Sequence, residues 1–308
     1  MARNILITGA TGLIGTCLVK TILKRGDNVA VLSTNVKSAS KYLPEAGKII
    51  SWNDYLSLVN ENIDIVINLA GKNIGETRWN DKFKKEIYDS RILSTRKIVD
   101  LIGKMTKKPG ALINASGVDY YGNRPACRTS RGDENIYEDA KPGNDFMARL
   151  CVDWEAEAKK AENFGVRVVL IRTGFVLAKN SPAVNMLTLP FKLFIGGTIG
   201  SGKQYMSWIH IDDVVKVYLF SADNNNITGP VNAAAPNPER MKNFCRIIAK
   251  VLHRPAIIPA PEFAVKLIAG EAAQLVLNGR KALPKKILEA GYKFSFANAP
   301  AAWSNILE

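Results

Sequence analysis

The sequence predicts an α/β protein, with a doubly wound parallel sheet and a smaller α+β lobe in the C-terminal part of the chain. Three observations support this fold class. A strand, a glycine-rich turn and a helix open the chain. Strand and helix patterns then alternate as far as about residue 180, and the alternation is looser beyond it. Strands separated by helices are typical of a parallel sheet that is covered on both faces.

The opening unit carries the strongest signal. Residues 4–8 form an apolar strand, residues 9–15 have the glycine spacing G-x-x-G-x-x-G, and an amphipathic helix ends at Gly26 before a second strand begins at Val29. Glycines let the backbone turn tightly beside a pyrophosphate, and a helix N-terminus offers unpaired N–H groups to its oxygens. The alternative is a purely structural turn. We expect a dinucleotide cofactor to contact this turn, at Gly9, Thr11, Gly12, Leu13, Ile14 and Gly15.

The elements that follow repeat the alternation. Strands are expected over residues 48–52, 63–69, 111–115 and 166–172, and helices over 81–102 and 145–163. A polar loop with glycine and proline spans residues 122–143. Ligands of such sheets bind outside the carboxyl ends of the strands. Ser33, Leu69, Ser116 and Thr173 stand at these ends.

The C-terminal third has a different organisation. Residues 181–206 contain two prolines and four glycines, which predicts a loop-rich segment. A helix over 212–220 and a strand at Val231 follow. Beyond them we expect helices over 239–252, 263–269 and 283–290, and short strands over 256–258 and 292–294. The predicted division is a dinucleotide-binding domain over residues 1–180, completed by about 207–237, and a substrate-binding lobe over 181–206 and 238–308.

Composition limits the partners. The formal net charge is +14, but the lysines are scattered over predicted helix faces without interleaved aromatic residues, which favours a solvated basic surface and no nucleic acid. No apolar run is long enough to span a bilayer, and the first strand leaves no room for a targeting peptide, so we expect a cytoplasmic monomer or homodimer without a membrane partner. The cysteines are far apart and are expected to be reduced: Cys17, Cys127, Cys151 and Cys245.

Several motifs follow one another in an order that resembles a known superfamily. They are T-G-A-T-G-L-I-G at 8–15, N-L-A-G at 68–71, a serine ahead of Y-G at 121–122, R-T-G at 172–174 and H-I-D-D-V-V at 210–215. This order resembles the extended short-chain dehydrogenase/reductase superfamily. The longer strings at 67–99, 200–215 and 283–294 resemble the group called epimerase family proteins, so the resemblance covers essentially the whole chain. It implies a Rossmann domain, a dinucleotide cofactor and a C-terminal lobe that closes over a small substrate.

The second strand indicates which dinucleotide is bound. A carboxylate after this strand would bind the adenosine ribose of NAD, and none is present. Ser33, Thr34 and Lys37 offer hydroxyls and a cation to a 2′-phosphate, which favours NADP over NAD. The alternative for Lys37 is a solvated loop residue. Relatives usually have arginine at the position of Thr34.

Further cofactor contacts are expected along the same edge of the sheet. A turn of small residues after the fourth strand permits close approach of the backbone, at Leu69, Ala70 and Gly71. Ala115 and Thr173 end two other strands. Glu86 and Arg91 lie on the long central helix and could contact the cofactor or a substrate anion, the alternative for both being ion pairs at the surface.

Catalysis in this superfamily uses a tyrosine and a lysine four residues later on one helix face, where the lysine lowers the pKa of the phenol. The corresponding helix of this chain has Met147 and Cys151 at these positions, or Phe146 and Leu150 if the register is shifted by one. Neither register supplies an acid or a base.

One literal Y-x-x-x-K remains, over residues 137–141, but a proline follows it and disfavours helical geometry. The remaining catalytic candidates are Ser116, at the usual place of the superfamily serine, and Tyr120 and Tyr121 just beyond it. The alternative for both tyrosines is that they only shape the pocket wall. No clustered metal ligands and no nucleophile elbow appear in the sequence.

Substrate contacts are expected from two segments. Residues after the fourth strand and residues ahead of the H-I-D-D-V-V motif could face the pocket: Lys72, Asn73, Arg78, Trp79, Gln204, Met206 and Trp208. Trp79 could equally be a packing residue. Two functions therefore compete. One is an NADP-dependent oxidoreductase or epimerase with a modified proton relay and an unknown small substrate. The other is an NADP(H)-binding redox sensor or scaffold without turnover. The names of some relatives connect such a protein with cell or organelle division.

Overall fold

The computed structural model describes residues 2–122 and 133–308 of the chain, so Cys127 and the part of the predicted polar loop over 123–132 lie outside the described residues. A seven-stranded sheet dominates the fold, with the strand order β11-β7-β5-β4-β1-β2-β3 and parallel pairing throughout. The predicted α/β fold class is confirmed. The strands of this sheet are β1 (Asn4–Thr8), β2 (Asn28–Ser33), β3 (Lys48–Ser51), β4 (Ile65–Asn68), β5 (Ala111–Gly117), β7 (Arg167–Thr173) and β11 (Gly229–Ala233).

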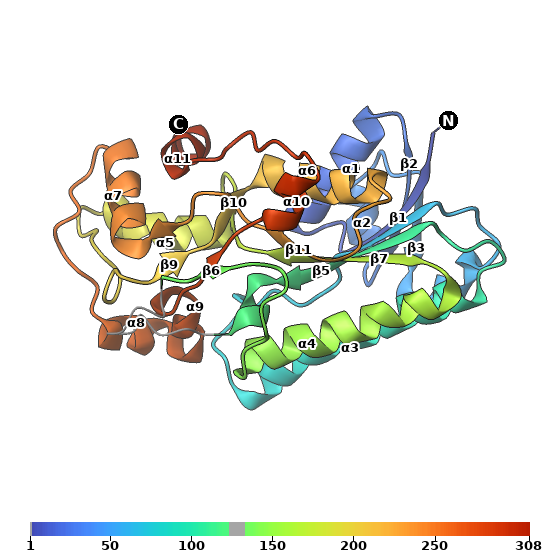
Figure 1. Cartoon of the computed structure of the whole chain (residues 1–308), viewed down its shortest axis with the longest axis horizontal. Coiled ribbons are helices and arrows are strands. Elements are labelled where there is room, and N and C mark those ends of the chain that lie inside the picture. The colour runs from blue at the N-terminus through green and yellow to red at the C-terminus, as the bar shows by residue number, and fades with distance from the viewer. Residues whose placement is uncertain (1, 123–132) are drawn as a thin grey trace.

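Helices cover both faces of the sheet, as Figure 1 shows. One face packs against α1 (Leu13–Lys24) and α6 (Ile211–Asp223), and the other against α3 (Asp81–Lys104) and the end of α4 (Phe146–Lys159). The strands are nearly continuous runs of buried β-branched and aliphatic residues, because a parallel sheet that is covered on both faces has no solvated side. Shorter helices α2 (Val36–Tyr42), η1 (Trp52–Leu58), η2 (Val118–Tyr121) and η4 (Lys160–Phe164) complete this part.

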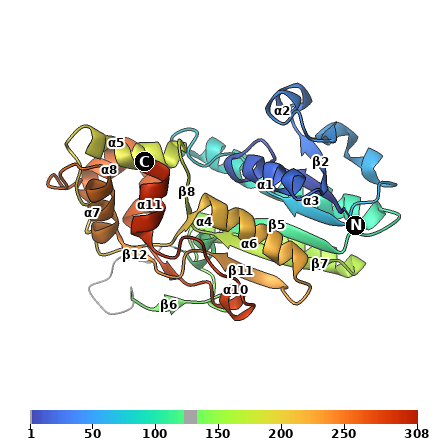
Figure 2. The same ribbon diagram turned by 90° about the horizontal axis from the view of Figure 1, so that it is seen from above.

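Elements such as α5 (Pro182–Lys192), α7 (Met241–Val251) and α11 (Ala299–Leu307) lie beyond the carboxyl ends of the strands, on the left of Figures 1 and 2. Their buried residues form a second hydrophobic core. Its largest fully buried members are Trp208, Trp303, Phe191 and Phe244. A separate core supports the predicted division into two units, which stays a prediction. The other elements outside the large sheet are β6 (Asn135–Ile136), β8 (Phe175–Leu177), β9 (Tyr205–Met206), β10 (Trp208–His210), β12 (Glu239–Arg240), α8 (Glu262–Ala269), η5 (Gly270–Ala273), α9 (Gln274–Leu277), β13 (Lys281–Ala282) and α10 (Lys285–Glu289).

Three expectations for the C-terminal third were wrong. The segment expected to be loop-rich contains α5, which starts with the Ser181 side chain accepting a bond from the N–H of Val184 and with proline in the first turn. Pro190 lies inside this helix, in its last turn, where it removes one hydrogen bond of the helix. No strand forms over 256–258 or 292–294, since short apolar runs do not by themselves distinguish strand from packed loop. None of the helices in the described ranges is long and apolar enough to cross a membrane.

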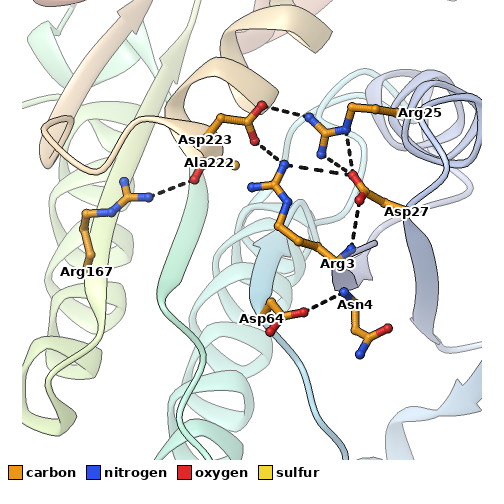
Figure 3. Close-up of polar contacts among 8 residues, drawn as sticks. All are labelled: Arg3, Asn4, Arg25, Asp27, Asp64, Arg167, Ala222 and Asp223. Carbon is orange, nitrogen blue, oxygen red and sulfur yellow. Dashed lines mark hydrogen bonds and ion pairs between the residues drawn. The ribbon is translucent and has the colours of Figure 1, made fainter. Parts of the chain in front are cut away.

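A polar cluster ties β1, α1 and α6 together at the amino ends of the strands (Figure 3). Asp27 accepts hydrogen bonds from the backbone N–H of Arg3 at 2.9 Å and from Nε of Arg25 at 2.7 Å. Both arginines also pair with Asp223, and Arg167 donates to the carbonyl groups at the C-terminal end of α6. Because the cluster lies at the edge opposite the predicted cofactor site, we assign it to stability.

This cluster gives a pH-dependent prediction. Burial raises the pKa of Asp27, but hydrogen bonds from Arg3 and Arg25 outweigh burial and lower the pKa below its ordinary value. A lowered carboxyl pKa stabilises the fold above the pKa of the unfolded chain, and this contribution is lost as the pH falls through the folded pKa. Asp27→Asn should therefore cost about 1 to 3 kcal/mol at pH 7 and progressively less below about pH 4. Urea unfolding at a series of pH values measures this; a cost that does not change with pH would contradict it.

Candidate functional site

The glycine turn is closely packed against its neighbours. Gly9 has a φ of +65°, and a Cβ there would lie 2.6 Å from the carbonyl oxygen of Leu69. A Cβ on Gly15 would lie 2.3 Å from the carbonyl oxygen of Gly9. These contacts are shorter than any real Cβ makes, so glycine is required at both positions. The backbone of the turn is thereby held against the end of β4.

The N-terminus of α1 is left open by this turn. Gly12 is its N-cap residue and has no side chain to accept a bond from the first N–H groups, and no acidic residue stands in the first turn. The helices α2 to α6, in contrast, all have a side chain that caps the N-terminus. Unpaired N–H groups at a helix N-terminus, together with the helix dipole, attract an anion.

A first cavity of about 640 Å³ extends from the glycine turn over the ends of β2 and β4. It is lined by most of the cofactor contacts predicted on this side: Gly9, Thr11, Gly12, Ser33, Thr34, Leu69, Ala70 and Gly71. Lys72, predicted to contact substrate, also lines it and pairs with Glu76 and Glu86. Glu86 and Lys37 are not among the lining residues, and Lys37 is an exposed residue of α2.

Sequence reasoning missed one wall of this cavity. Trp52 and a stripe along α3 line it, the stripe consisting of Asp89, Ser90, Leu93, Ser94 and Lys97. The stripe has the three- and four-residue spacing of one helix face, a signal that was available in the sequence. Asp89 is ion-paired with Lys85. The first cavity is thus lined by two lysines, Lys72 and Lys97, and also by Ser33 and Thr34, whose side chains carry hydroxyl groups.

A second cavity of about 350 Å³ lies on the other side of the glycine turn, which lines both. Its walls include further predicted residues: Leu13, Ile14, Gly15, Arg91, Ala115, Ser116 and Thr173. Met147 and Cys151 also line it, from α4. Burial raises the pKa of the Cys151 thiol to about 12. This thiol stays protonated at neutral pH and is therefore not a general base.

Arg91 is the cation of the second cavity. Its guanidinium donates to the carbonyl oxygen of Ile87 and lies 5.3 Å from the ring centre of Trp154. The backbone of Gly71 packs against it, since a Cβ there would lie 3.0 Å from Cζ of Arg91. Burial lowers the pKa of Arg91, and no carboxylate within the described ranges pairs with it. An ionised guanidinium in such surroundings favours binding of an anion.

Ser116 belongs to a buried network behind the cavity wall. Its hydroxyl donates to Oε1 of Glu155 at 2.7 Å, and Glu155 accepts two more bonds from Arg172, each of 2.8 Å. Arg172 also donates to the hydroxyl of Tyr121, which donates to Asn232 at 2.6 Å. Burial raises the pKa of Tyr121 to about 12.

The two tyrosines predicted as catalytic candidates lie in this network. Tyr120 stacks on Arg172, whose Cζ lies 3.4 Å from the ring centre. Neither Tyr120 nor Tyr121 lines the cavities described here. The structure therefore brings Ser116 to the cofactor edge and leaves both phenols in the packing behind it.

A third cavity of about 230 Å³ adjoins the second and reaches into the C-terminal lobe. Of the residues predicted to contact substrate, Met206 lines it. An ion pair of 2.7 Å between Asp119 and Arg280 also lines it and links the two parts of the protein. Arg280 was not predicted, because nothing in its local sequence distinguishes it from the surrounding lysines.

The other predicted substrate contacts do not line the three cavities. Trp79 is buried and donates to the carbonyl oxygen of Ile74, and Trp208 is buried in the second core. Gln204 donates to two backbone carbonyl groups, and Arg78 donates to the carbonyl oxygen of Leu267. Asn73 accepts a bond from the N–H of Gly75. Contact of these side chains with a substrate stays a prediction.

Comparison with known proteins agrees with this geometry. The model of the NAD dependent epimerase/dehydratase family matches residues 5–234. The chain belongs to this family. A domain of unknown function, DUF1731, matches residues 260–306. This range contains α8, α9, α10 and all of α11 except Leu307. The superfamily resemblance predicted from the motifs is confirmed.

Family relatives extend over the whole chain. The epimerase family protein YfhF of Bacillus subtilis is 36% identical over 99% of this chain and 98% of its own. The chloroplastic SDR39U1 homolog of Arabidopsis thaliana is 38% identical over 98% of this chain and 86% of its own. A crystal structure of the human epimerase family protein SDR39U1 with NADPH superposes with a TM-score of 0.87, at 32% identity and with 99% of both chains covered.

Proposed function

We propose that this epimerase family protein binds NADP(H) through the first two cavities and transfers hydride to or from a small molecule in the third. The carrying observation is the open N-terminus of α1 between two cavities. A dinucleotide has two nucleosides joined by a pyrophosphate, which matches two cavities joined at an anion-binding turn. The human SDR39U1 structure, which holds NADPH, supports the same assignment.

Two features support NADP(H) over NAD(H). The end of β2 presents Ser33 and Thr34 to the first cavity and no carboxylate to bind a ribose 2′-hydroxyl. Lys97 of α3 lines the same cavity and brings a cation to a 2′-phosphate. Lys37, the cation predicted for this role, lies outside the lining. We therefore assign the role to Lys97.

Calorimetry tests this assignment. NADPH should bind more tightly than NADH, and Lys97→Met should weaken NADPH binding by about tenfold or more, because a charge-assisted hydrogen bond contributes about 1.5 to 3 kcal/mol. NADH binding should hardly change. Lys37→Met is the matched control and should leave both affinities unaltered. Tighter binding of NADH by the wild-type protein would refute the assignment.

Catalysis would differ from that of the wider superfamily. The bound nicotinamide supplies the hydride donor or acceptor. With its one hydroxyl hydrogen donated to Glu155, Ser116 would accept a hydrogen bond from a substrate hydroxyl, and it would have to turn away from Glu155 to donate to a reacting carbonyl oxygen. Met206 and the Asp119–Arg280 pair would bound the substrate. Met147 and Cys151 offer no proton relay, so the proton would exchange with solvent. We infer that this suits reduction of an activated carbonyl or alkene, whose barrier depends least on a strong acid.

Two of the residues that α4 contributes to the second cavity, Met147 and Cys151, favour a second function. With a thiol of raised pKa and a thioether in place of the acid and base, the protein would serve as a sensor that binds NADPH and NADP⁺ with different affinities. The two functions separate when protein loaded with NADPH deuterated at C4 is offered aldehydes, ketones, quinones and enones. Deuterium in a product, lost in Ser116→Ala, supports the enzyme. No transfer, together with a large affinity difference between the two redox states, supports the sensor.

A further inference from the structure

The second cavity carries a positive charge to which no role has been assigned so far. Within the described ranges, two charged residues line this cavity, Arg91 of α3 and Asp119. Asp119 is paired with Arg280 at 2.7 Å, so its charge is compensated. Of the five N–H donors of Arg91, one has an acceptor in the described parts of the chain, the carbonyl oxygen of Ile87. The charge of Arg91 is therefore left for a ligand.

The structure also distinguishes between the two registers considered for α4. Met147 and Cys151 both line the second cavity. In the shifted register Leu150 lines it but Phe146 does not, and the ring of Phe146 instead makes an edge-to-face contact with Trp79. The tyrosine and lysine positions implied by the superfamily resemblance therefore correspond to Met147 and Cys151, and α4 brings no cation to the cavity.

The guanidinium of Arg91 lies close to the place of this missing lysine. Its Cζ is 5.3 Å from the ring centre of Trp154, which follows Cys151 by three residues and so lies on the same face of α4. Burial raises the pKa of the Cys151 thiol, and the charge of Arg91 opposes this rise, which places the two groups within electrostatic reach of each other. A cation lost from α4 is thus replaced by one from α3.

The proposed function determines what this charge faces. If the 2′-phosphate of the adenosine lies at Ser33 and Thr34 in the first cavity, the nicotinamide half lies in the second. The nicotinamide ring is positively charged in NADP⁺ and neutral in NADPH. We propose that Arg91 replaces the missing lysine as the cation beside the nicotinamide and, by repelling the oxidised ring, makes the protein bind NADPH more tightly than NADP⁺. This inference rests on the proposed binding of NADP(H).

Calorimetry with three ligands tests the assignment. They are NADPH, NADP⁺ and 2′-phospho-ADP-ribose, a fragment that has the pyrophosphate but no nicotinamide. Arg91→Gln removes the charge and should reduce the ratio of the NADPH to the NADP⁺ affinity by about tenfold, the effect of one unit charge several ångströms away inside a protein. Affinity for the fragment should not change. Circular dichroism verifies that the variant is folded.

Two further variants make the test specific to this position. Arg96→Gln removes a cation from the same helix, but Arg96 is largely exposed, pairs with Glu157 and lies outside the three cavities, so the ratio should not change. The double variant Arg91→Gln/Cys151→Lys returns a cation to α4 and should recover most of the ratio lost in Arg91→Gln.

Several results would overturn the proposal. Equal affinity of the wild-type protein for NADPH and NADP⁺ does so without any variant. The same holds if Arg91→Gln leaves the ratio unaltered, or if it weakens all three ligands equally, which would place the guanidinium at the pyrophosphate. A double variant that recovers none of the ratio would also contradict it. If the wild-type protein binds none of the three ligands, the proposed function itself is wrong.

Discussion

Glu155→Gln is expected to destabilise the protein by about 3 to 5 kcal/mol, because removing one charge of a buried ion pair leaves the other uncompensated. Glu155 and Arg172 are 4% and 3% exposed, and two bonds of 2.8 Å join them. Burial on its own would lower the pKa of Arg172, but Glu155 outweighs burial and raises it. Without this carboxylate the guanidinium still stays charged, because the ordinary pKa of arginine lies far above 7. Urea unfolding at pH 7 measures the cost.

Two variants provide the controls. Glu157→Gln lies on the same helix, but the partners of Glu157 are the largely exposed Arg96 and Lys160. Its cost should be below about 1 kcal/mol. The double variant Glu155→Met/Arg172→Met removes both buried charges and should be more stable than Glu155→Gln. If Glu155→Gln were as stable as the wild-type protein, the buried ion pair between Glu155 and Arg172 would not stabilise the fold.

The buried network around Arg172 also explains why the catalytic candidates were hard to assign from sequence. Ser116, Tyr120 and Tyr121 are close in the chain, so they were expected to face one pocket. The 3-10 helix η2 begins directly after β5 and turns the two tyrosines toward Arg172. Which way a side chain points after a strand depends on a partner 51 residues away for Tyr121, and local patterns do not contain that information.

The cofactor edge, in contrast, was largely predictable. Glycine spacing after a strand specifies a backbone conformation, and the contacts of Gly9 and Gly15 show the steric reason for it. Parallel strands then bring Ser33, Leu69 and Thr173 to one edge, whatever the loops do. The missed residues Lys97 and Arg280 come from a helix face and a distant loop. Lys97 and Arg280 reach the cavities only because that helix face and that loop pack over the carboxyl ends of the strands. No sequence motif marks either residue.

The C-terminal lobe was the least predictable part for a related reason. Its short elements are held by contacts between distant segments, as in the pairing of β13 with β6 and of β12 with β9. Two-residue strands of this kind have no pattern of their own. The helix α5 was missed because prolines and glycines near it were counted without regard to their place at its start and end.

Gly15→Ala is expected to abolish measurable NADPH binding at micromolar concentrations while the purified variant retains its secondary structure. Alanine has the higher helix propensity, so a simple helix position would gain stability. Here the added Cβ would meet the carbonyl oxygen of Gly9 at 2.3 Å and Cα of Ala10 at 2.7 Å, both backbone atoms. The turn must move, and the N–H groups at the start of α1 lose their aim at the phosphates. Each charge-assisted bond lost costs about 1.5 to 3 kcal/mol, or roughly 10- to 150-fold in affinity.

A graded series makes this prediction specific to the turn. A Cβ on Gly12 would lie 3.3 Å from the carbonyl oxygen of Gly9, and Gly12 lines both cavities, so Gly12→Ala should bind NADPH more weakly than wild type but better than Gly15→Ala. Gly47→Ala places its Cβ at an ordinary 3.6 Å from a carbonyl oxygen on an exposed loop and should bind normally. Circular dichroism verifies folding, and calorimetry measures the affinities. The expected order follows how closely the added methyl group meets the turn backbone in Gly15→Ala and Gly12→Ala, while Gly47→Ala leaves the turn untouched. Equal binding by all three variants would show that the pyrophosphate lies elsewhere.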